Sequence, residues 1–327
     1  MQIKISNLKE DFENIIWIGA LSFEDRCLGS LDSLFNNNLQ ITKAFIVDYL
    51  NVLTASKECE ENRSRNKKKM TELIKNQFQF LSVHPYRYSE FLGILGKTYK
   101  EISESNERCA IVIDFSCFTK IHTVALAYWI CQQKLSIPIV LAYSNPEIYG
   151  NPYRNIWGKG KWITTLHIRL DLNSTESYSS TNIIAILGHE GDRLRLSINE
   201  AEPDNGLVIK VLPKELPSRL SIVTDIQNSW LYHEIDKGLR DFSIKKIRYN
   251  DIEELIKLIT TYCNAAKDKK SRIVLCPFGP KPFIYYTAFT ILTSYSKLAW
   301  LYYPIPLSYD PDYSKGFDRT MWFSSVP

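Results

Sequence analysis

The chain has 327 residues, of which 45% are hydrophobic and 23% charged, and its formal net charge at pH 7 is +4. This composition is typical of globular proteins and excludes disordered, fibrous and collagen-like chains. The small net charge gives no whole-protein argument for nucleic-acid binding, although Lys and Arg can still cluster on one face. The length is sufficient for two domains that each bury a core.

The cysteines and the amino-terminal residues indicate the cellular compartment of the protein. The chain has seven cysteines, an odd number, and none belongs to a Cys-x-x-Cys pair. Several lie in apolar runs, which favours buried thiols in a reducing compartment. Residues 1–6 lack the apolar core of a signal peptide, and no uncharged stretch approaches the length of a membrane span. We therefore expect a cytoplasmic protein that makes no membrane contact.

Apolar β-branched runs alternate with helical patterns through residues 1–150. The expected strands are residues 15–20, 44–48, 80–83, 109–114 and 137–142. The expected helices are residues 27–35, 54–75, 90–102 and 122–132. Buried strands that alternate with helices indicate a parallel sheet covered on both faces. Residues 1–150 are therefore predicted to form a Rossmann-like unit.

A polar stretch predicts a linker over residues 151–180, and residues 181–327 then repeat the plan. The expected strands are residues 183–187, 221–225, 244–248, 272–276 and 298–303, and the expected helices are residues 229–239, 252–266 and 282–295. Residues 194–199 and 206–211 flank Pro203-Asp204-Asn205-Gly206, which predicts a β-hairpin insertion. The predicted fold class is α/β, with two duplicated Rossmann-like units, mostly parallel sheets and a β-hairpin in the second.

Two pairs of motifs recur at an offset of about half the chain. Asp25-Arg26 follows the first apolar run of the first half, and Asp192-Arg193 follows the first apolar run of the second. The strand that ends at Asp114 is likewise matched by residues 273–276, and each leads to a lysine and an apolar helix. We infer a duplicated unit with a ligand cleft between its copies. Because the two copies differ in their polar residues, we expect this cleft to be pseudo-symmetric.

The polar motifs follow the predicted strands, where open parallel sheets bind their ligands. The candidate ligand-binding residues are Asp25, Arg26, Asp114, Ser116, Thr119, Lys120, Asp192, Arg193, Gly279, Pro280 and Lys281. Loops of this kind present N–H groups, hydroxyls and an ammonium, which suit a phosphate. A lysine at a positive helix terminus also indicates an anionic partner. The alternatives are that the Asp-Arg pairs are helix-start charges and that Asp114 caps the next helix.

Three residues are candidates for catalysis: Ser22, His189 and Lys281. His189-Glu190 is a candidate general base, although a single histidine also serves as a packed or hydrogen-bonded side chain. We predict no metal site, since the sequence has no His-Glu-x-x-His motif and no second histidine close to His189. We also predict no cofactor, because the glycine-rich motifs of dinucleotide sites and P-loops are missing.

Residues 309–319 contain too much Pro, Gly and Asp for a helix. A surface tail is one interpretation. A lid over the ligand site is the other, because the segment follows the strand that is expected to be the fifth of its sheet.

At the ends of the fourth strands, the chain resembles CARF domains and the related SAVED domains, in which two CARF-like units are fused. The residues that carry the resemblance are Asp114, Ser116, Thr119 and Lys120 in the first half and Gly279, Pro280 and Lys281 in the second. The resemblance implies a Rossmann-like sensor that binds a cyclic oligonucleotide across a paired cleft in bacterial antiviral defence. It also implies that ring cleavage would use a hydroxyl near the first strand together with the motif lysine.

Three functions stay open at this point. The first is a binding protein for a nucleotide or cyclic oligonucleotide, with an effector protein as partner. The second is a phosphodiesterase or ring-nuclease-like enzyme acting on nucleotides or nucleic acid. The third is a subunit of a defence complex without a small ligand. A homo-oligomer is compatible with each of them.

Overall fold

The computed structural model describes residues 2–6, 8, 12, 14–50, 56–75, 77–104, 109–133, 135–149, 162–171, 174–189, 191–213, 219–306 and 314–327. The chain divides into two compact units. The first unit comprises Met1–Asn151 together with Ser308–Pro327, and the second comprises Pro152–Leu307.

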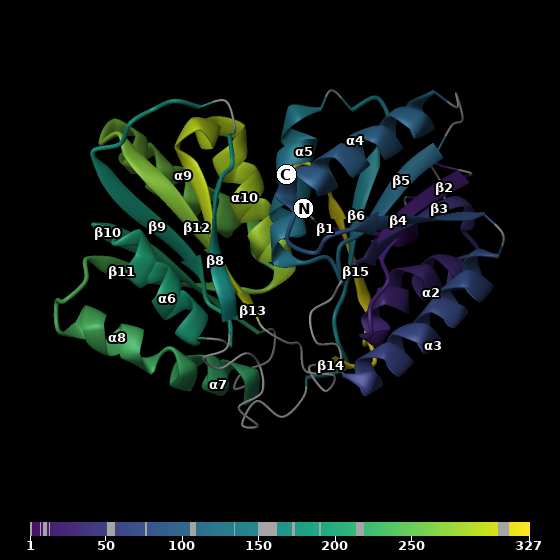
Figure 1. Cartoon of the computed structure of the whole chain (residues 1–327), viewed down its shortest axis with the longest axis horizontal. Helices are drawn as coiled ribbons and strands as arrows, with labels where there is room; N and C mark the ends of the chain where they lie inside the picture. The colour runs from purple at the N-terminus through teal and green to yellow at the C-terminus, as the bar shows by residue number, and fades with distance from the viewer. Residues whose placement is uncertain are drawn as a thin grey trace. The chain divides into compact units, whose positions relative to one another are not determined.

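The first unit contains a seven-stranded sheet in the order β1-β15-β6-β5-β2-β3-β4 (Figure 1). Its strands are β1 (Gln2–Ile3), β2 (Asn14–Ala20), β3 (Gln40–Tyr49), β4 (Phe78–Val83), β5 (Cys109–Asp114), β6 (Ile139–Ser144) and β15 (Thr320–Ser324). The five strands β2 to β6 are parallel, and β15 joins β6 in antiparallel pairing. A small antiparallel pair, β7 (Ile148–Tyr149) with β14 (Ser314–Lys315), also belongs to this unit.

Helices cover both faces of this sheet. They are η1 (Asp25–Leu28), α2 (Gly29–Asn36), α3 (Lys57–Ile74), α4 (Tyr88–Ser103) and α5 (Lys120–Gln132). α2 and α3 lie on one face, and α4 and α5 lie on the other (Figure 1).

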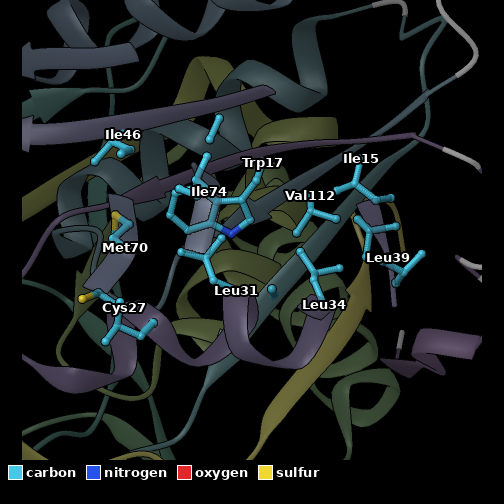
Figure 2. Close-up of a cluster of buried hydrophobic side chains, with 14 of the residues drawn as sticks. Ile15, Trp17, Cys27, Leu31, Leu34, Leu39, Ile46, Met70, Ile74 and Val112 are labelled. Atoms are coloured by element: carbon cyan, nitrogen blue, oxygen red, sulfur yellow. The ribbon is translucent and has the colours of Figure 1, made fainter. Parts of the chain in front are cut away.

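The core on the α2 side surrounds Trp17, which is fully buried. Figure 2 shows its ring among Leu31, Met70, Ile74 and Val112. The indole N–H donates to Ser30 Oγ at 2.9 Å, which satisfies the polar edge of a large buried ring.

The second unit contains a six-stranded sheet in the order β11-β10-β9-β12-β13-β8. Its strands are β8 (Trp162–Arg169), β9 (Ser180–Ile186), β10 (Asn205–Leu212), β11 (Phe242–Arg248), β12 (Ser271–Pro277) and β13 (Ala299–Pro306). The strands β9 to β13 are parallel, and β8 pairs with β13 in antiparallel fashion. Each sheet has five parallel strands, which can be numbered by their order in the chain. Across both sheets they lie side by side in the order third, second, first, fourth, fifth, and an antiparallel strand pairs with the fifth. The predicted α/β class with mostly parallel sheets is confirmed.

Helices also cover both faces of the second sheet. They are α6 (Gly191–Ala201), α7 (Arg219–Gln227), α8 (Ser229–Asp236), α9 (Ile252–Asp268), α10 (Lys281–Tyr295) and the short η2 (Ser296–Leu298). α9 and α10 pack beside each other, and α6 and α8 lie on the opposite side of the sheet (Figure 1). Within the described residues, no helix has the length and apolar character that a membrane span requires.

The predicted β-hairpin in the second unit is wrong. Its first arm, residues 194–199, lies in α6, and its second arm belongs to β10, which pairs in parallel with β9 and β11. The helix forms because Leu194, Ile198 and Ala201 recur at helical spacing and are all buried. The left-handed backbone of Glu202, with φ of 44°, ends the helix just before the turn that leads into β10.

The predicted strand at residues 221–225 is also wrong, because these residues lie in α7. Its apolar, β-branched character is equally compatible with a short helix, and β10 already occupies the second position of the parallel sheet.

The unit boundaries differ from the predicted ones at two edge strands. β8 lies within residues 151–180, which were expected to be a linker, and it completes the second sheet. β15 lies within residues 181–327, which were expected to form the second unit, and it completes the first sheet. In each case a distant segment covers the open edge of a fifth parallel strand. Residues 151–161 and 172–173 of the predicted linker lie outside the described residues.

Candidate functional site

Asp114 ends β5, and its side chain is only 2% exposed. Its carboxylate accepts from the Ser116 N–H at 2.9 Å and from the Ser30 hydroxyl. Because Ser30 also accepts from Trp17, Asp114 joins the loop after β5 to α2 and to the core. Asp114 therefore helps to hold the loop that ends at Thr119, just before Lys120 begins α5.

Ser116, which is fully buried, connects the ends of neighbouring strands. Its hydroxyl accepts from the Ser144 N–H at 2.7 Å, and Ser144 Oγ lies 2.8 Å from Thr320 Oγ1. This chain of hydrogen bonds crosses from the β5 loop to β6 and β15.

Thr119 is the N-cap of α5, and Lys120 is the first residue of that helix. The Thr119 hydroxyl accepts from the His122 N–H at 3.2 Å and lies 2.9 Å from the Pro85 carbonyl, to which it donates. Its own N–H donates to Tyr49 Oη at 3.2 Å. The cap is of the kind that stabilises helix starts, and it holds the half-buried Lys120 at the positive end of α5.

His122 contacts Tyr49, the residue that accepts from the Thr119 N–H of this cap. Its ring is fully buried, stacks on Phe91 with centroids 4.1 Å apart, and places Nδ1 3.0 Å from Tyr49 Oη. Burial lowers the pKa of His122 to about 3, so the imidazole is neutral in the folded protein at neutral pH.

We expect His122 to make the first unit less stable as the pH falls below about 6.5, the ordinary pKa of histidine. Between that pH and about 3 the unfolded chain binds a proton that the folded chain excludes. The free energy of unfolding should fall by about 1.4 kcal/mol per pH unit from this residue. Urea unfolding of the wild type and a His122→Phe variant between pH 7.5 and 5 measures it. Equal pH slopes for the two proteins would contradict the assignment.

The loop after β2 carries a buried ion pair between Glu24 and Arg26. Arg26 donates Nε and Nη2 to the Glu24 carboxylate at 2.9 and 3.0 Å, and Ser314 donates its hydroxyl to the same carboxylate. Burial alone would lower the pKa of Arg26, but attraction by Glu24, Tyr143 and neighbouring groups holds it above its ordinary value. The guanidinium therefore stays charged and neutralises Glu24.

Asp25, in the same loop, accepts from the Gly316 N–H at 3.2 Å and from Arg65 at 2.7 Å. Together with the bond from Ser314 to Glu24, this places residues 314–316 against the loop after β2. These residues belong to residues 309–319, the segment for which the sequence left a surface tail and a lid over the ligand site as alternatives. Residues 309–313 of that segment lie outside the described residues.

Arg193 lies in the first turn of α6, at the position in the second unit that corresponds to Arg26 in the first, and is 3% exposed. It donates Nε and Nη2 to the Pro304 carbonyl at 3.1 and 2.6 Å, and its guanidinium lies 4.5 Å from the centre of the Tyr303 ring. Arg26 likewise reaches the fifth parallel strand of its own sheet, through Tyr143 Oη at 3.4 Å. In each unit, the recurring arginine thus joins the helix that follows the first parallel strand to the fifth parallel strand. Asp192, beside Arg193, is exposed.

Gly279, Pro280 and Lys281 follow β12. A Cβ at Gly279 would lie 2.3 Å from Ile186 Cγ2, so the glycine allows this loop to pack on the end of β9. Pro280 is the N-cap residue of α10, and Lys281, 9% exposed, is the first residue of that helix. Lys281 therefore has the same position after β12 that Lys120 has after β5.

The three candidate catalytic residues belong to both units. Ser22 follows β2 in the first unit, where its half-buried hydroxyl accepts from the Glu24 N–H at 3.2 Å. His189 follows β9 in the second unit and places Nδ1 2.8 Å from Thr224 Oγ1. Because β9 and β12 are paired, His189 and Lys281 follow neighbouring strands. Glu190 lies outside the described residues. In the described part of the chain, no group of three or more His, Cys, Asp or Glu residues could hold a metal ion.

The sequence analysis did not predict an ion pair at the carboxyl half of β10. Lys210 is 8% exposed and donates to both carboxylate oxygens of Asp225 at 2.6 Å, and Tyr232 donates to the same carboxylate at 2.9 Å. The incorrect assignment of residues 221–225 to a strand concealed it. The lysine within an otherwise apolar strand was the available signal.

Neither a protein-family model nor a curated protein matches the sequence. Solved structures with related architecture exist. The chain resembles a CRISPR defence nuclease in fold. That protein is a type III CRISPR defence DNA nuclease activated by cyclic oligoadenylate, with a TM-score of 0.50 and 7% identity over 88% of this chain and 65% of the nuclease. At this identity the likeness concerns the fold alone.

Two further structures are more distant. Can2 from Sulfobacillus thermosulfidooxidans, in complex with cyclic tetra-adenylate, has a TM-score of 0.27 and 17% identity over 39% of this chain and 31% of Can2. UDP-GlcNAc 2-epimerase from Neisseria meningitidis, bound to UDP-GlcNAc, has a TM-score of 0.24 and 9% identity over 86% of this chain and 92% of the epimerase. The chain thus spans less than two thirds of the length of both the nuclease and Can2.

Proposed function

We propose that this protein binds a nucleotide or cyclic oligonucleotide at the carboxyl ends of its parallel strands, as a sensor in bacterial antiviral defence. One observation carries the proposal. In both sheets, the loop after the fourth parallel strand ends in a lysine that is the first residue of an apolar helix, Lys120 of α5 and Lys281 of α10. A helix N-terminus favours an anion, and a lysine beside it adds a second attraction for the same anion. A phosphate would receive both the ammonium and the N–H groups of the helix start.

The common strand order of the two sheets supports a duplicated unit. A cyclic oligonucleotide repeats its phosphate, so two similar lysine loops suit it better than they suit a ligand with a single anionic group. The resemblance to CARF and SAVED domains points to the same ligand class, and one protein of similar fold is a nuclease that cyclic oligoadenylate activates.

Within this proposal the candidate residues have two roles. The residues that meet the ligand lie at the starts of α5 and α10 and just before them: Thr119, Lys120, Gly279, Pro280 and Lys281. Asp25 and Asp192 lie in the first turns of the neighbouring helices η1 and α6. The buried side chains of Asp114 and Ser116 hold the loop after β5 in position, and Arg26 and Arg193 join η1 and α6 to β6 and β13.

Isothermal titration of the full chain with cyclic di-, tri- and tetranucleotides tests the proposal. We expect at least one ligand to bind with micromolar or lower Kd, and we expect Lys120→Ala and Lys281→Ala each to weaken it at least about tenfold, the loss of one charge-assisted contact of about 1.5–3 kcal/mol. Lys257→Ala, at an exposed position of α9, is the matched control and should bind as the wild type does. The proposal fails if no cyclic nucleotide binds, or if the three variants behave alike.

Cleavage of the ligand is the second candidate function, because His189 and Lys281 follow paired strands. His189 would act as general base, and Lys281 would stabilise the charge that develops on the phosphate. Ser22 is the hydroxyl that the resemblance adds to this set. Incubation of the bound ligand with wild type and Lys281→Ala, followed by chromatography, decides between sensing and cleavage. An intact ligand in both samples excludes cleavage.

A further inference from the structure

One edge of the seven-stranded sheet in the first unit is open. β4 is the last strand of this sheet, and among the described residues no strand pairs with its outer side. At the other end of the sheet, β15 covers the fifth parallel strand. An open edge carries a row of backbone N–H and C=O groups that can pair with another chain.

Hydrogen bonds to β3 show which backbone groups of β4 point outward. The carbonyls of Gln77 and Val83, at the two ends of the strand, accept from N–H groups of the β3 segment at 2.8 and 2.9 Å. Because the direction of the backbone groups alternates along a strand, Phe78, Phe80 and Ser82 direct their N–H and C=O groups away from β3. These three residues therefore form the outer edge.

The sequence of β4 does not protect this edge from pairing. Residues 78–83 contain no charged residue and no proline. β11, which is the last strand of the second sheet, carries the exposed side chains of Lys245, Lys246 and Arg248. Charged side chains are a common means by which edge strands avoid pairing with other chains. By this criterion β11 is protected from pairing, whereas β4 is suited to accept another strand.

Two charges on α3 indicate which strand β4 accepts. Glu60 and Lys67 are exposed and lie seven residues apart, which is about two helical turns, so they share one side of the helix. This side faces β4, because Lys67 Nζ lies 4.4 Å from the centre of the Phe80 ring. Arg65 lies on the other side and donates to Asp25 of η1. Since helical side chains lean toward the helix N-terminus, Phe80 is level with the part of α3 between Glu60 and Lys67.

This charge pattern is complementary to itself. If two copies of β4 pair in antiparallel fashion about the two Phe80 residues, the two α3 helices also run antiparallel on one face of the joined sheet. Glu60 of each copy then lies opposite Lys67 of the other. A single strand from a different protein would not present the same pair of charges in reverse order.

We propose that β4 pairs with β4 of a second copy of this chain, with Phe78 opposite Ser82 and Phe80 opposite Phe80. This pairing satisfies the outward backbone groups of the edge and continues the sheet through both copies. The dimer is independent of the proposed sensing function, because β4 and the outer side of α3 contain none of the candidate site residues.

Analytical ultracentrifugation of the full chain between about 1 and 100 µM tests the proposal, a range that covers weak and stable dimers. We expect a species of twice the 37.9 kDa of one chain. Ser82→Pro removes an outward N–H at both ends of the pairing and should raise the dimer Kd at least about a hundredfold. Lys246→Pro makes the same change on the outer side of β11 and should leave the dimer intact. Circular dichroism confirms that both variants are folded.

A charge exchange tests the pairing partner. Glu60→Lys should weaken the dimer about tenfold, because it places like charges opposite each other in two symmetric positions. The double variant Glu60→Lys with Lys67→Glu should restore association, since the exchanged charges again meet across the two copies. The proposal is overturned if the wild type stays monomeric at 100 µM, which would leave the edge to a different protein. It is also overturned if Ser82→Pro associates as Lys246→Pro does, or if the double variant is as weak as Glu60→Lys.

Discussion

Replacement of Glu24 by Ala should lower the free energy of unfolding of the first unit by about 3–5 kcal/mol. The reason is the burial of its partner, because the side chains of Arg26 and Glu24 are only 6% and 11% exposed. Without Glu24, Arg26 would retain the long hydrogen bond of 3.4 Å from Nη1 to Tyr143 Oη, and Ser314 would lose its acceptor. Chemical denaturation followed by tryptophan fluorescence and circular dichroism measures the loss.

Two further variants test the cause. The double variant Glu24→Leu with Arg26→Met removes both charges and should be clearly more stable than Glu24→Ala, because apolar replacement of a whole buried pair is often neutral. Glu101→Ala breaks the pair with Lys43, whose side chains are 41% and 45% exposed, and should cost less than about 1 kcal/mol. A double variant as unstable as Glu24→Ala would show that packing, rather than the unpaired charge, determines the loss.

Gly188→Ala should destabilise the second unit by about 1–3 kcal/mol or more, the range of overpacked core sites. A Cβ at this position would lie 2.0 Å from the Phe278 carbonyl oxygen and 2.7 Å from its carbon. Because these are backbone atoms, the loops after β9 and β12 would have to separate. The same displacement would move Lys281, so we also expect weaker binding of any ligand that this lysine contacts.

The matched control is the same chemical change where the new methyl group has room. Gly93 is exposed in the middle of α4, and among the described residues no atom beyond its chain neighbours and the adjacent backbone of its own helix lies within 4 Å of its ideal Cβ. Gly93→Ala should therefore stabilise the first unit by about 0.5–1 kcal/mol, since alanine loses less backbone entropy in a helix. Thermal and urea unfolding of both variants measure the two effects. If they share a sign, the steric explanation for Gly188 is wrong.

The parallel strands were predictable because both of their faces are buried. Residues 109–114 and 183–187 are nearly continuous apolar runs, and the structure buries them completely in β5 and β9. The helix starts at Lys120 and Lys281 were predictable for a related reason, since polar or proline-containing loops precede long apolar segments.

The pairing of the edge strands could not be predicted in the same way. β15 is a short, largely apolar run. Its sequence does not indicate that it pairs with β6 of the first unit rather than with a strand of the second unit, which directly precedes it in the chain. Ser314 and Glu24 are 290 residues apart in the chain, and no sequence pattern near either residue indicates that they form a hydrogen bond. The recurrence of Asp-Arg was visible in the sequence, but the burial of Arg26 and Arg193 depends on Tyr143 and Pro304, which only the folded sheets bring close.

The insertion of β15 into the first sheet has a consequence for the order of folding during synthesis. Trp322 of β15 is part of the hydrophobic cluster around Trp17, yet the ribosome makes it after all of the second unit. The second unit, Pro152–Leu307, can therefore complete its sheet first, although domains usually fold in the order of synthesis. Until then, β6 exposes an unpaired edge, and a nascent chain in this condition is open to chaperones and to aggregation.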